Sequence, residues 1–502
     1  MTKDSKIIKK IKQNIYKWHR TLGIITLVPV IFWTLSGIMH PLMAHFLKPE
    51  IAHEKLDIAP INKSQIKLSV QEILKINKLD VYKNFRIVSF QNKTYYQIKN
   101  IFGDYQYFDA STATELKNGD QKYAEYLSRY FLDDYKSKVS KIDVITEFTS
   151  QYKYINRYLP VYKLTFNRDD AMEIYVETSS SKLATYNPKS RQIFIWVFDM
   201  FHNWAFIDAI SNNYIRISVM LLFLSIILFS AISGIVISGF MWKKFKKVTP
   251  NNSEGFLRRN HRKIGIIVSF LTLTFAFSGG YHATQKWKPA FLPKMIYEPL
   301  IKVSDLPISS TKFNIDYSQL TNISVIKFKK NCYFQCSIFD EETENKTNNY
   351  IHAISNKQEN IEIEYAKFLA TKFSKMLLNP EKGCCEMDEN QSSNNLELKS
   401  SSILTDFDKR EYGFVNKRLP VVKLEYKTND DSTFYIETAT SRLAAVVNSS
   451  NRLEGCSFAI FHKFLLMEWA GKNVRDFINV FAALGVLVVS VLGLILFVKK
   501  EK

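Results

Sequence analysis

Six of the nine histidines stand at corresponding positions in the two halves of the sequence, and these are the residues best suited to chemistry. Neutral imidazole is a good axial ligand for haem iron, and helix bundles supply such ligands from facing helices. A single histidine near a membrane surface is more often an anchor, but three matched sets favour a redox cofactor. The matched histidines are His19 with His261, His40 with His282, and His202 with His462.

The spacing of the histidines predicts two depths in a membrane. His19 and His40 are 21 residues apart, as are His261 and His282. On a continuous helix that spacing rises about 31 Å and leaves both rings within about 60° of one face. We therefore expect His19 and His261 to form a pair at the cytoplasmic end of the bundle. The outer end offers four candidate ligands, enough for one haem or two.

Four apolar, charge-free runs are long enough to cross roughly 30 Å of hydrocarbon. Lysines and arginines cluster before the first run, between the second and third, and after the fourth. By the positive-inside rule, both termini and the loop between the second and third runs face the cytoplasm. The expected spans are Leu22–Met39, Ile217–Phe240, Ile264–Tyr281 and Phe477–Val498.

Internal similarity continues outside the membrane runs. The segment NRYLPVYKLTF (156–166) matches NKRLPVVKLEY (416–426), and FDMFHNW (198–204) matches FAIFHKF (458–464). Repetition of long segments at a constant offset indicates an internal duplication. Each copy reads as a span, an outer domain, a histidine-bearing segment and a second span.

The predicted fold is therefore a membrane protein, a four-transmembrane-helix bundle from an internal duplication, with two extracytoplasmic α+β domains. The expected regions are a cytoplasmic N-terminus and first span (1–41), outer domain 1 (42–190), a histidine-bearing amphipathic segment with the second span (191–242), a cytoplasmic loop (243–263), the third span (264–282), outer domain 2 (283–450), and a second histidine-bearing segment with the fourth span (451–502).

Two turn motifs carry a family resemblance. The segments YVETSSSKL (175–183) and YIETATSRL (435–443) resemble the Tyr-x-Asp-Pro-x-Thr-Gly-Glu-Val turn of PepSY domains, with Glu177 and Glu437 in place of the aspartate. We expect both glutamates to be structural. The arrangement W-H-R before the first span, S-G-x-x-H at its end and F-H later resembles the PepSY-associated transmembrane family.

That resemblance implies a haem-containing inner-membrane protein of the ferric-siderophore reductase or iron-regulated kind, in a bacterial cytoplasmic membrane. The expected cofactor is haem b, one or two per chain, with the six matched histidines as candidate axial ligands of its iron. Arg216 and Arg475, on the outer side, are candidate partners for haem propionates, because the guanidinium fork matches a carboxylate. The expected substrate is a ferric siderophore or another ferric chelate.

No cytoplasmic segment exceeds about 25 residues, which leaves no room for a nicotinamide or flavin domain of ordinary size. The electron donor is then membrane quinol or a redox partner protein. Two other functions stay open: an anchored PepSY regulator of secreted peptidases without enzymatic activity, and an accessory protein for siderophore transport.

The net charge of +20 could suggest a nucleic-acid partner. The basic residues instead flank the apolar runs, and no nucleic-acid-binding motif is present, so we expect a lipid bilayer as partner and no nucleic acid. No C-x-x-C-H occurs, which excludes covalent c-type haem.

Overall fold

The computed structural model describes residues 3–247, 253–287, 294–307, 317–340, 342, 345–378, 397–408 and 411–501. The chain divides into two compact units. The helical unit comprises Met1–Pro49, Lys189–Pro289 and Ser450–Lys502, and the sheet unit comprises Glu50–Pro188 and Ala290–Ser449.

Four helices of the helical unit are long and apolar enough to cross a membrane. The chain is therefore a mixed α+β protein with four candidate membrane spans, Leu27–Phe46, Asn213–Gly239, Gly255–Thr284 and Lys472–Lys499. The helices of this unit are α1 (Lys3–Ile25), α2 (Leu27–Phe46), α5 (Lys189–Phe201), α6 (Asn213–Lys247), α7 (Ser253–Thr284), α9 (Ser449–Ser457, which begins at the last residue of the sheet unit) and α10 (Lys472–Glu501).

The first candidate span does not follow the expected Leu22–Met39. Helix α1 ends at Ile25 and α2 begins at Leu27, with Thr26 as the junction. Pro29 explains the break. It has no N–H to donate to the carbonyl of Ile25, and its ring would clash with that carbonyl.

The break changes one expectation about the histidines. His19 lies on α1 and His40 on α2, so two helices joined at one residue carry them. Thr26 keeps a right-handed helical conformation, and the amides of Thr26 and Val30 still donate to the carbonyls four residues earlier. His261 and His282 do share the uninterrupted helix α7.

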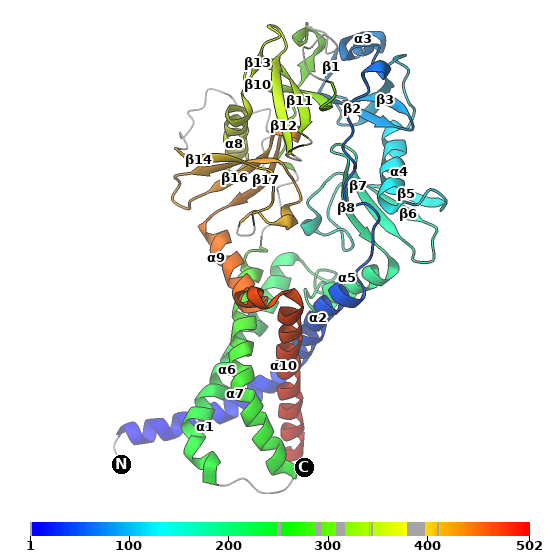
Figure 1. The fold of residues 1–502 in the computed structure, drawn as a ribbon. Coiled ribbons are helices and arrows are strands. Elements are labelled where there is room, and N and C mark those ends of the chain that lie inside the picture. The colour runs from blue at the N-terminus through cyan, green and yellow to red at the C-terminus, as the bar shows by residue number, and fades with distance from the viewer. Residues whose placement is uncertain are drawn as a thin grey trace. The chain divides into compact units, whose positions relative to one another are not determined.

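The helices of this unit pack around a small apolar core. Helix α6 packs against α7, α10 packs against α2 and α7, and α1 packs against α6 (Figure 1). Lipid is as apolar as the side chains, so close packing, rather than burial from water, must hold such helices together. The buried core residues are Val30, Leu224, Ile227, Val268, Ala276 and Val486.

The described residues of the sheet unit form four sheets. The strand orders are β13-β12-β11-β10-β2-β3-β4, β5-β6-β7-β8, β14-β15-β16-β17 and β1-β9. The strands are β1 (Val81–Tyr82), β2 (Asn84–Phe90), β3 (Lys93–Lys99), β4 (Tyr105–Asp109), β5 (Val139–Ile145), β6 (Val161–Phe166), β7 (Glu173–Glu177), β8 (Lys182–Asn187), β9 (Ile301–Lys302), β10 (Leu320–Phe328), β11 (Asn331–Asp340), β12 (Asn345–His352), β13 (Gln358–Glu359), β14 (Leu398–Leu404), β15 (Val421–Tyr426), β16 (Thr433–Glu437) and β17 (Arg442–Val447).

The seven-stranded sheet joins the regions 42–190 and 283–450. Strand β2 pairs antiparallel with β10, with Arg86 opposite Ser324. Pairing these strands removes two open sheet edges, which would otherwise expose unpaired backbone groups. The two regions expected as outer domains therefore form one unit with a shared sheet.

Each four-stranded sheet is covered by a helix with the same buried spacing. Helix α4 (Gly119–Leu132) packs against β6 and β7, and α8 (Glu362–Leu378) packs against β15 and β16. Three large side chains on each helix recur at i, i+4 and i+8, and burying each contributes about 1.5–3 kcal/mol. They are Tyr123, Leu127 and Phe131 on α4, and Tyr365, Leu369 and Phe373 on α8. The third described helix of this unit, α3 (Val70–Ile76), begins with a capping box between Ser69 and Glu72.

Candidate functional site

The six matched histidines lie in the helical unit, where four of them form two close pairs. The rings of His19 and His261 have their centroids 6.3 Å apart and their planes at 58°. The rings of His202 and His462 have their centroids 6.5 Å apart and their planes at 89°. Each pair takes one histidine from the first half of the sequence and one from the second.

The Nδ1 atoms of the His19–His261 pair face backbone carbonyls. Nδ1 of His19 lies 3.1 Å from the carbonyl oxygen of Ser230 and 2.9 Å from Oγ of Ser233. Nδ1 of His261 lies 3.2 Å from the carbonyl oxygen of Val489. A carbonyl only accepts hydrogen bonds, so Nδ1 of each ring carries the proton and Nε2 keeps its lone pair.

Each histidine of the His202–His462 pair faces a serine hydroxyl, and each also has a backbone hydrogen bond, His202 with Trp33 and His462 with Phe275. Nδ1 of His202 lies 3.1 Å from Oγ of Ser36, and Nδ1 of His462 lies 3.2 Å from Oγ of Ser278. Each hydroxyl donates its single proton to the carbonyl four residues earlier on its own helix. The hydroxyls therefore accept from Nδ1, and Nε2 is again the unprotonated nitrogen.

A glycine faces each of the four paired rings. A Cβ added at Gly234 would lie 3.2 Å from Cε1 of His19, and one at Gly493 would lie 3.4 Å from Cε1 of His261. The corresponding distances at Gly37 and Gly279, to His202 and His462, are 3.8 and 3.9 Å. The nearest neighbours that an added Cβ would meet at these four glycines are therefore imidazole rings.

Local backbone geometry positions the His202–His462 pair. The amides of Asn203 and Lys463 donate to carbonyls five residues earlier, at Phe198 and Phe458, as in a π-helical turn. Such turns are frequent at functional sites. Phe198 and Phe458 stack on the histidine four residues later, with centroids 4.4 and 4.6 Å apart.

Further hydrogen bonds fix the carbonyls of the same two histidines. The indole nitrogen of Trp33 donates to the carbonyl of His202 at 2.9 Å, and the side-chain amide of Asn479 donates to that of His462 at 3.1 Å. Trp33 also stacks on the buried ring of Trp204, with centroids 4.8 Å apart. Trp33 therefore has a structural role next to the pair, beyond the interface position expected of a membrane tryptophan.

His40 and His282 do not form a comparable pair, because among the described residues their rings do not contact one another. His40 lies beside the rings of Phe194 and Phe198. Nδ1 of His282 lies 2.6 Å from a carboxylate oxygen of Glu454, so its partner is an acid.

The two arginines have different surroundings. Arg216 is bound to Asp208 at 2.9 Å, and it donates to the carbonyl of Asn203 at 2.9 Å and to the side chain of Asn213 at 2.6 Å. Arg475 is half-buried and lies near the charge of Lys463. Within the described part of the chain, the Arg475 guanidinium has no hydrogen bond or ion pair.

The three unmatched histidines have local structural roles. His45 pairs with Asp476 at 2.9 Å, and His53 stacks on Tyr130 in the sheet unit. Nδ1 of His352 accepts from two backbone amides that follow it in its turn.

The glutamates of the tyrosine-containing turns lie at a buried ion cluster of the sheet unit. Arg418 contacts Glu177 at 3.0 Å and Glu437 at 2.7 Å, and Lys182 contacts Glu437 at 3.0 Å. Burial opposes ionisation of both carboxyls, yet their pKa values lie below the ordinary value because of the neighbouring cations. The cluster connects the two sequence halves, in keeping with the structural role expected of these glutamates.

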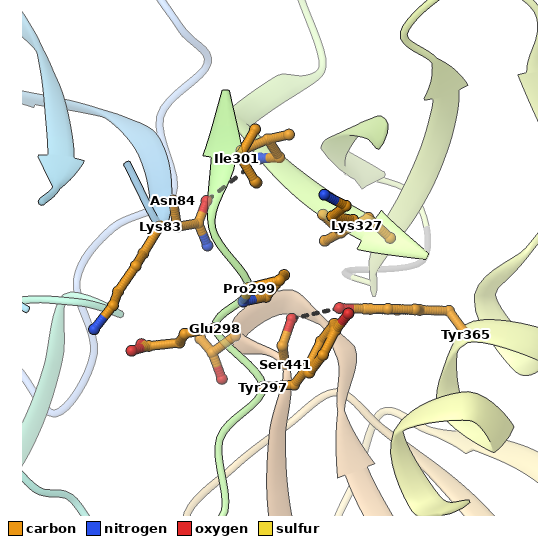
Figure 2. A pocket seen from close by; sticks show the side chains of 12 residues that line it. Lys83, Asn84, Tyr297, Glu298, Pro299, Ile301, Lys327, Tyr365 and Ser441 are labelled. Carbon is orange, nitrogen blue, oxygen red and sulfur yellow. Dashed lines mark hydrogen bonds between the residues drawn. The ribbon is translucent and has the colours of Figure 1, made fainter. Parts of the chain in front are cut away.

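A pocket of the sheet unit contains no matched histidine. It lies between β2, β10 and the segment 297–301, and its lining includes Asn84, Glu298 and Lys327 (Figure 2). Tyr365 and Ser441 are hydrogen-bonded to one another at its wall. No group of three or more histidine, cysteine, aspartate or glutamate side chains among the described residues could hold a metal ion.

No model of a known protein family matches this chain, and a comparison with curated proteins finds no match either. The assignment of chemistry therefore depends on the geometry of the histidine pairs. Sequence reasoning named all six histidines but missed Ser36 and Ser278 as their hydrogen-bond partners. The recurrence of a serine beside the glycine in both halves was the available signal.

Proposed function

We propose that this chain is a haem-binding membrane protein that transfers electrons from one face of the membrane to the other. The observation that carries the proposal is the presence of two histidine pairs with ring centroids 6.3 and 6.5 Å apart. An imidazole nitrogen binds a transition metal at about 2 Å and its ring centre lies about 1 Å further, so two imidazoles on one metal have centres about 6 Å apart. Both pairs meet that requirement.

The protonation of the rings supports the same function. All four paired histidines have Nδ1 hydrogen-bonded, and among the described residues Nε2 has no hydrogen-bond partner and could bind a metal. Metal-bound histidines usually donate their other ring N–H to a carbonyl or another acceptor, which fixes the tautomer and the ring orientation. A two-histidine site suits haem in particular, because the porphyrin supplies the other ligands of the iron.

The two pairs lie at different depths of the bundle. Helix α7 carries His261 of one pair and Gly279, which faces His462 of the other. At 1.5 Å per residue these positions are about 27 Å apart along the helix axis. The distance between two one-electron centres at these positions would be nearly as large as the thickness of a hydrocarbon layer, which is about 30 Å.

The proposal also includes the orientation of the chain in the membrane, its bacterial origin and its internal duplication. The basic residues flanking the spans support cytoplasmic termini and a place in a bacterial inner membrane, with the sheet unit outside. The matching contacts of His202 with Ser36 and of His462 with Ser278 support an internal duplication. The PepSY resemblance of the two tyrosine-containing turns supports assigning the sheet unit to that type of domain.

Within this arrangement each protein group has a defined task. Bound haem b would supply reversible one-electron transfer between ferric and ferrous iron. The serines and carbonyls orient the imidazoles, and the glycines leave space for the rings. Arg475 is the candidate partner for a haem carboxylate, whereas Arg216 already binds Asp208.

The proposed reaction reduces a ferric siderophore or another ferric chelate on the outer side. Oxidation of one quinol to quinone releases two electrons and two protons, and the two electrons reduce two ferric ions to ferrous ions. A redox partner protein is the other possible donor. The acceptor is inferred from the family resemblance, since no described pocket identifies it.

Optical spectra of the purified protein test the proposal. The chain is produced in haem-replete cells, purified in detergent, and examined oxidised and after reduction with dithionite. We expect the Soret shift of haem b and two haems per chain. A colourless protein would refute the proposal and leave the anchored regulator or the transport accessory as the function.

Histidine variants then locate the haems. We expect His19→Ala to lose one haem and His202→Ala to lose the other, because each removes one ligand of a different pair. His45→Ala is the matched control, since His45 lies on α2 but belongs to neither pair and should leave both haems in place. Loss of haem in the control to the same extent would contradict the assignment of ligands.

A further inference from the structure

Building on the proposed function, we propose that Lys463 and Arg475 together bind the carboxylates of the haem at the His202–His462 pair. The two histidines come from matching positions of a duplicated chain, but only the second half offers such cations. The haem carboxylates are then held from the second half alone.

Both cations lie next to His462. Lys463 follows it directly, and the Lys463 ammonium lies 5.3 Å from the ring centre of Phe458, which stacks on His462. Arg475 is four residues before Asn479 on α10, so these two side chains share a face of the helix. The side-chain amide of Asn479 donates to the carbonyl of His462 at 3.1 Å, which brings that face of α10 to the histidine.

Among the described residues, neither cation has an ion-pair partner. Arg475 lies close enough to Lys463 for the two positive charges to act on one another. Like charges at short range repel, and an anion bound between them would convert that repulsion into attraction. A pair of carboxylates on one ligand suits this arrangement, because the guanidinium fork and the ammonium each bind carboxylate oxygens.

The acids close to these cations are bound to histidines. Glu454, whose charge acts on Lys463, contacts His282 at 2.6 Å. Asp476 contacts His45 at 2.9 Å. Neither carboxylate therefore takes the place of an external anion.

The matching positions of the first half offer no such site. Asn203 stands where the second half has Lys463, and its side-chain amide donates to a carboxylate oxygen of Asp199 at 3.2 Å. Arg216, which matches Arg475, is already bound to a carboxylate and to the carbonyl of Asn203. Haem carboxylates on that side would meet an acid and a cation that is already paired.

Binding of haem and of haem dimethyl ester, whose carboxylates are blocked, tests this inference in the full chain in detergent. A His19→Ala background restricts binding to the His202–His462 pair. We expect this chain to bind haem about tenfold more tightly than the ester, because only haem forms hydrogen bonds between charged groups. Adding Lys463→Gln and Arg475→Gln should abolish the preference by weakening haem alone, whereas a merely structural effect would weaken both ligands equally.

Lys472→Gln is the matched control. Lys472 is an exposed cation at the start of α10, and its replacement should leave the preference for haem unchanged. An equal loss of the preference in this control would overturn the inference, because net charge would then hold the carboxylates.

The results separate this inference from the proposed function. A chain that binds neither haem nor the ester refutes both. Equal binding of haem and its ester overturns the inference and leaves the proposed function intact. If the preference for haem persists in the double variant while binding of ferric citrate is lost, the cations serve the substrate and the inference is again overturned. If the double variant binds no ligand, the single Lys463→Gln variant must show a reduced preference for haem.

Discussion

Under the proposed function, replacing Gly234 by alanine should weaken haem retention at the His19–His261 pair. The added Cβ would lie 3.2 Å from Cε1 of His19, whereas carbon atoms pack best at about 3.5–4.0 Å. The ring must therefore retreat by roughly half an ångström, at the limit of what a preorganised site tolerates. Overpacking of this kind costs about 1–3 kcal/mol, equivalent to roughly 5- to 150-fold weaker binding.

The assay is haem content per purified chain and the rate of haem transfer to apomyoglobin. Gly493→Ala should show a smaller effect, because its Cβ would lie 3.4 Å from the ring of His261, and Gly37→Ala should be nearly neutral at 3.8 Å. Gly239→Ala is the control for helix propensity, because it has nothing within 4 Å. If Gly234→Ala retains haem as tightly as Gly239→Ala does, the glycine does not serve to make room for the ligand.

Four further predictions concern the buried ion cluster, Trp33 and the ring planes of the paired histidines. Arg418→Ala should destabilise the sheet unit by about 3–5 kcal/mol, measured by chemical denaturation, because it leaves the buried carboxylates of Glu177 and Glu437 without a shared cation. The folded-state pKa of both carboxyls is depressed, so their contribution should be present above about pH 4.5 and be lost as the pH falls, which denaturation at pH 3–7 would detect. Trp33→Phe should cost about 1 kcal/mol of stability by removing the donor to the carbonyl of His202, with the loss seen as a lower melting temperature. If both pairs bind haem as proposed, their ring planes at 89° and 58° should give two distinct low-spin ferric signals in electron paramagnetic resonance, since perpendicular imidazoles leave two iron d orbitals nearly equal in energy. A single signal from a chain with two haems would contradict the described ring orientations.

The four candidate spans were predictable because hydrophobic length is a local property. Each run contains enough consecutive apolar residues for the prediction, and the helices match in number and approximate position. The first span was displaced because Pro29 acts on the carbonyl four residues earlier. The place where the helix breaks depends on the surrounding backbone as well as on this proline.

The identity of the paired histidines could be predicted only in part. His19 and His261 were expected as a pair from symmetry, and their rings lie 6.3 Å apart. Four candidates remained at the other end, and the structure brings His202 and His462 together. Each of these two histidines lies within a π-type turn, closed by the bonds of Asn203 to Phe198 and of Lys463 to Phe458, which the sequence pattern does not reveal.

Internal repetition, span length and charge distribution are carried by short stretches of sequence. The sequence by itself therefore determined which residues recur, which segments can cross a membrane and which three histidine sets are candidate ligands. It could not determine that Ser36 and Ser278 accept hydrogen bonds from histidines more than 160 residues away, or that Arg418 connects the glutamates of both halves. Those contacts arise from the packing of distant segments, because hydrogen bonds and ion pairs form only between groups that the tertiary fold brings within about 3 Å.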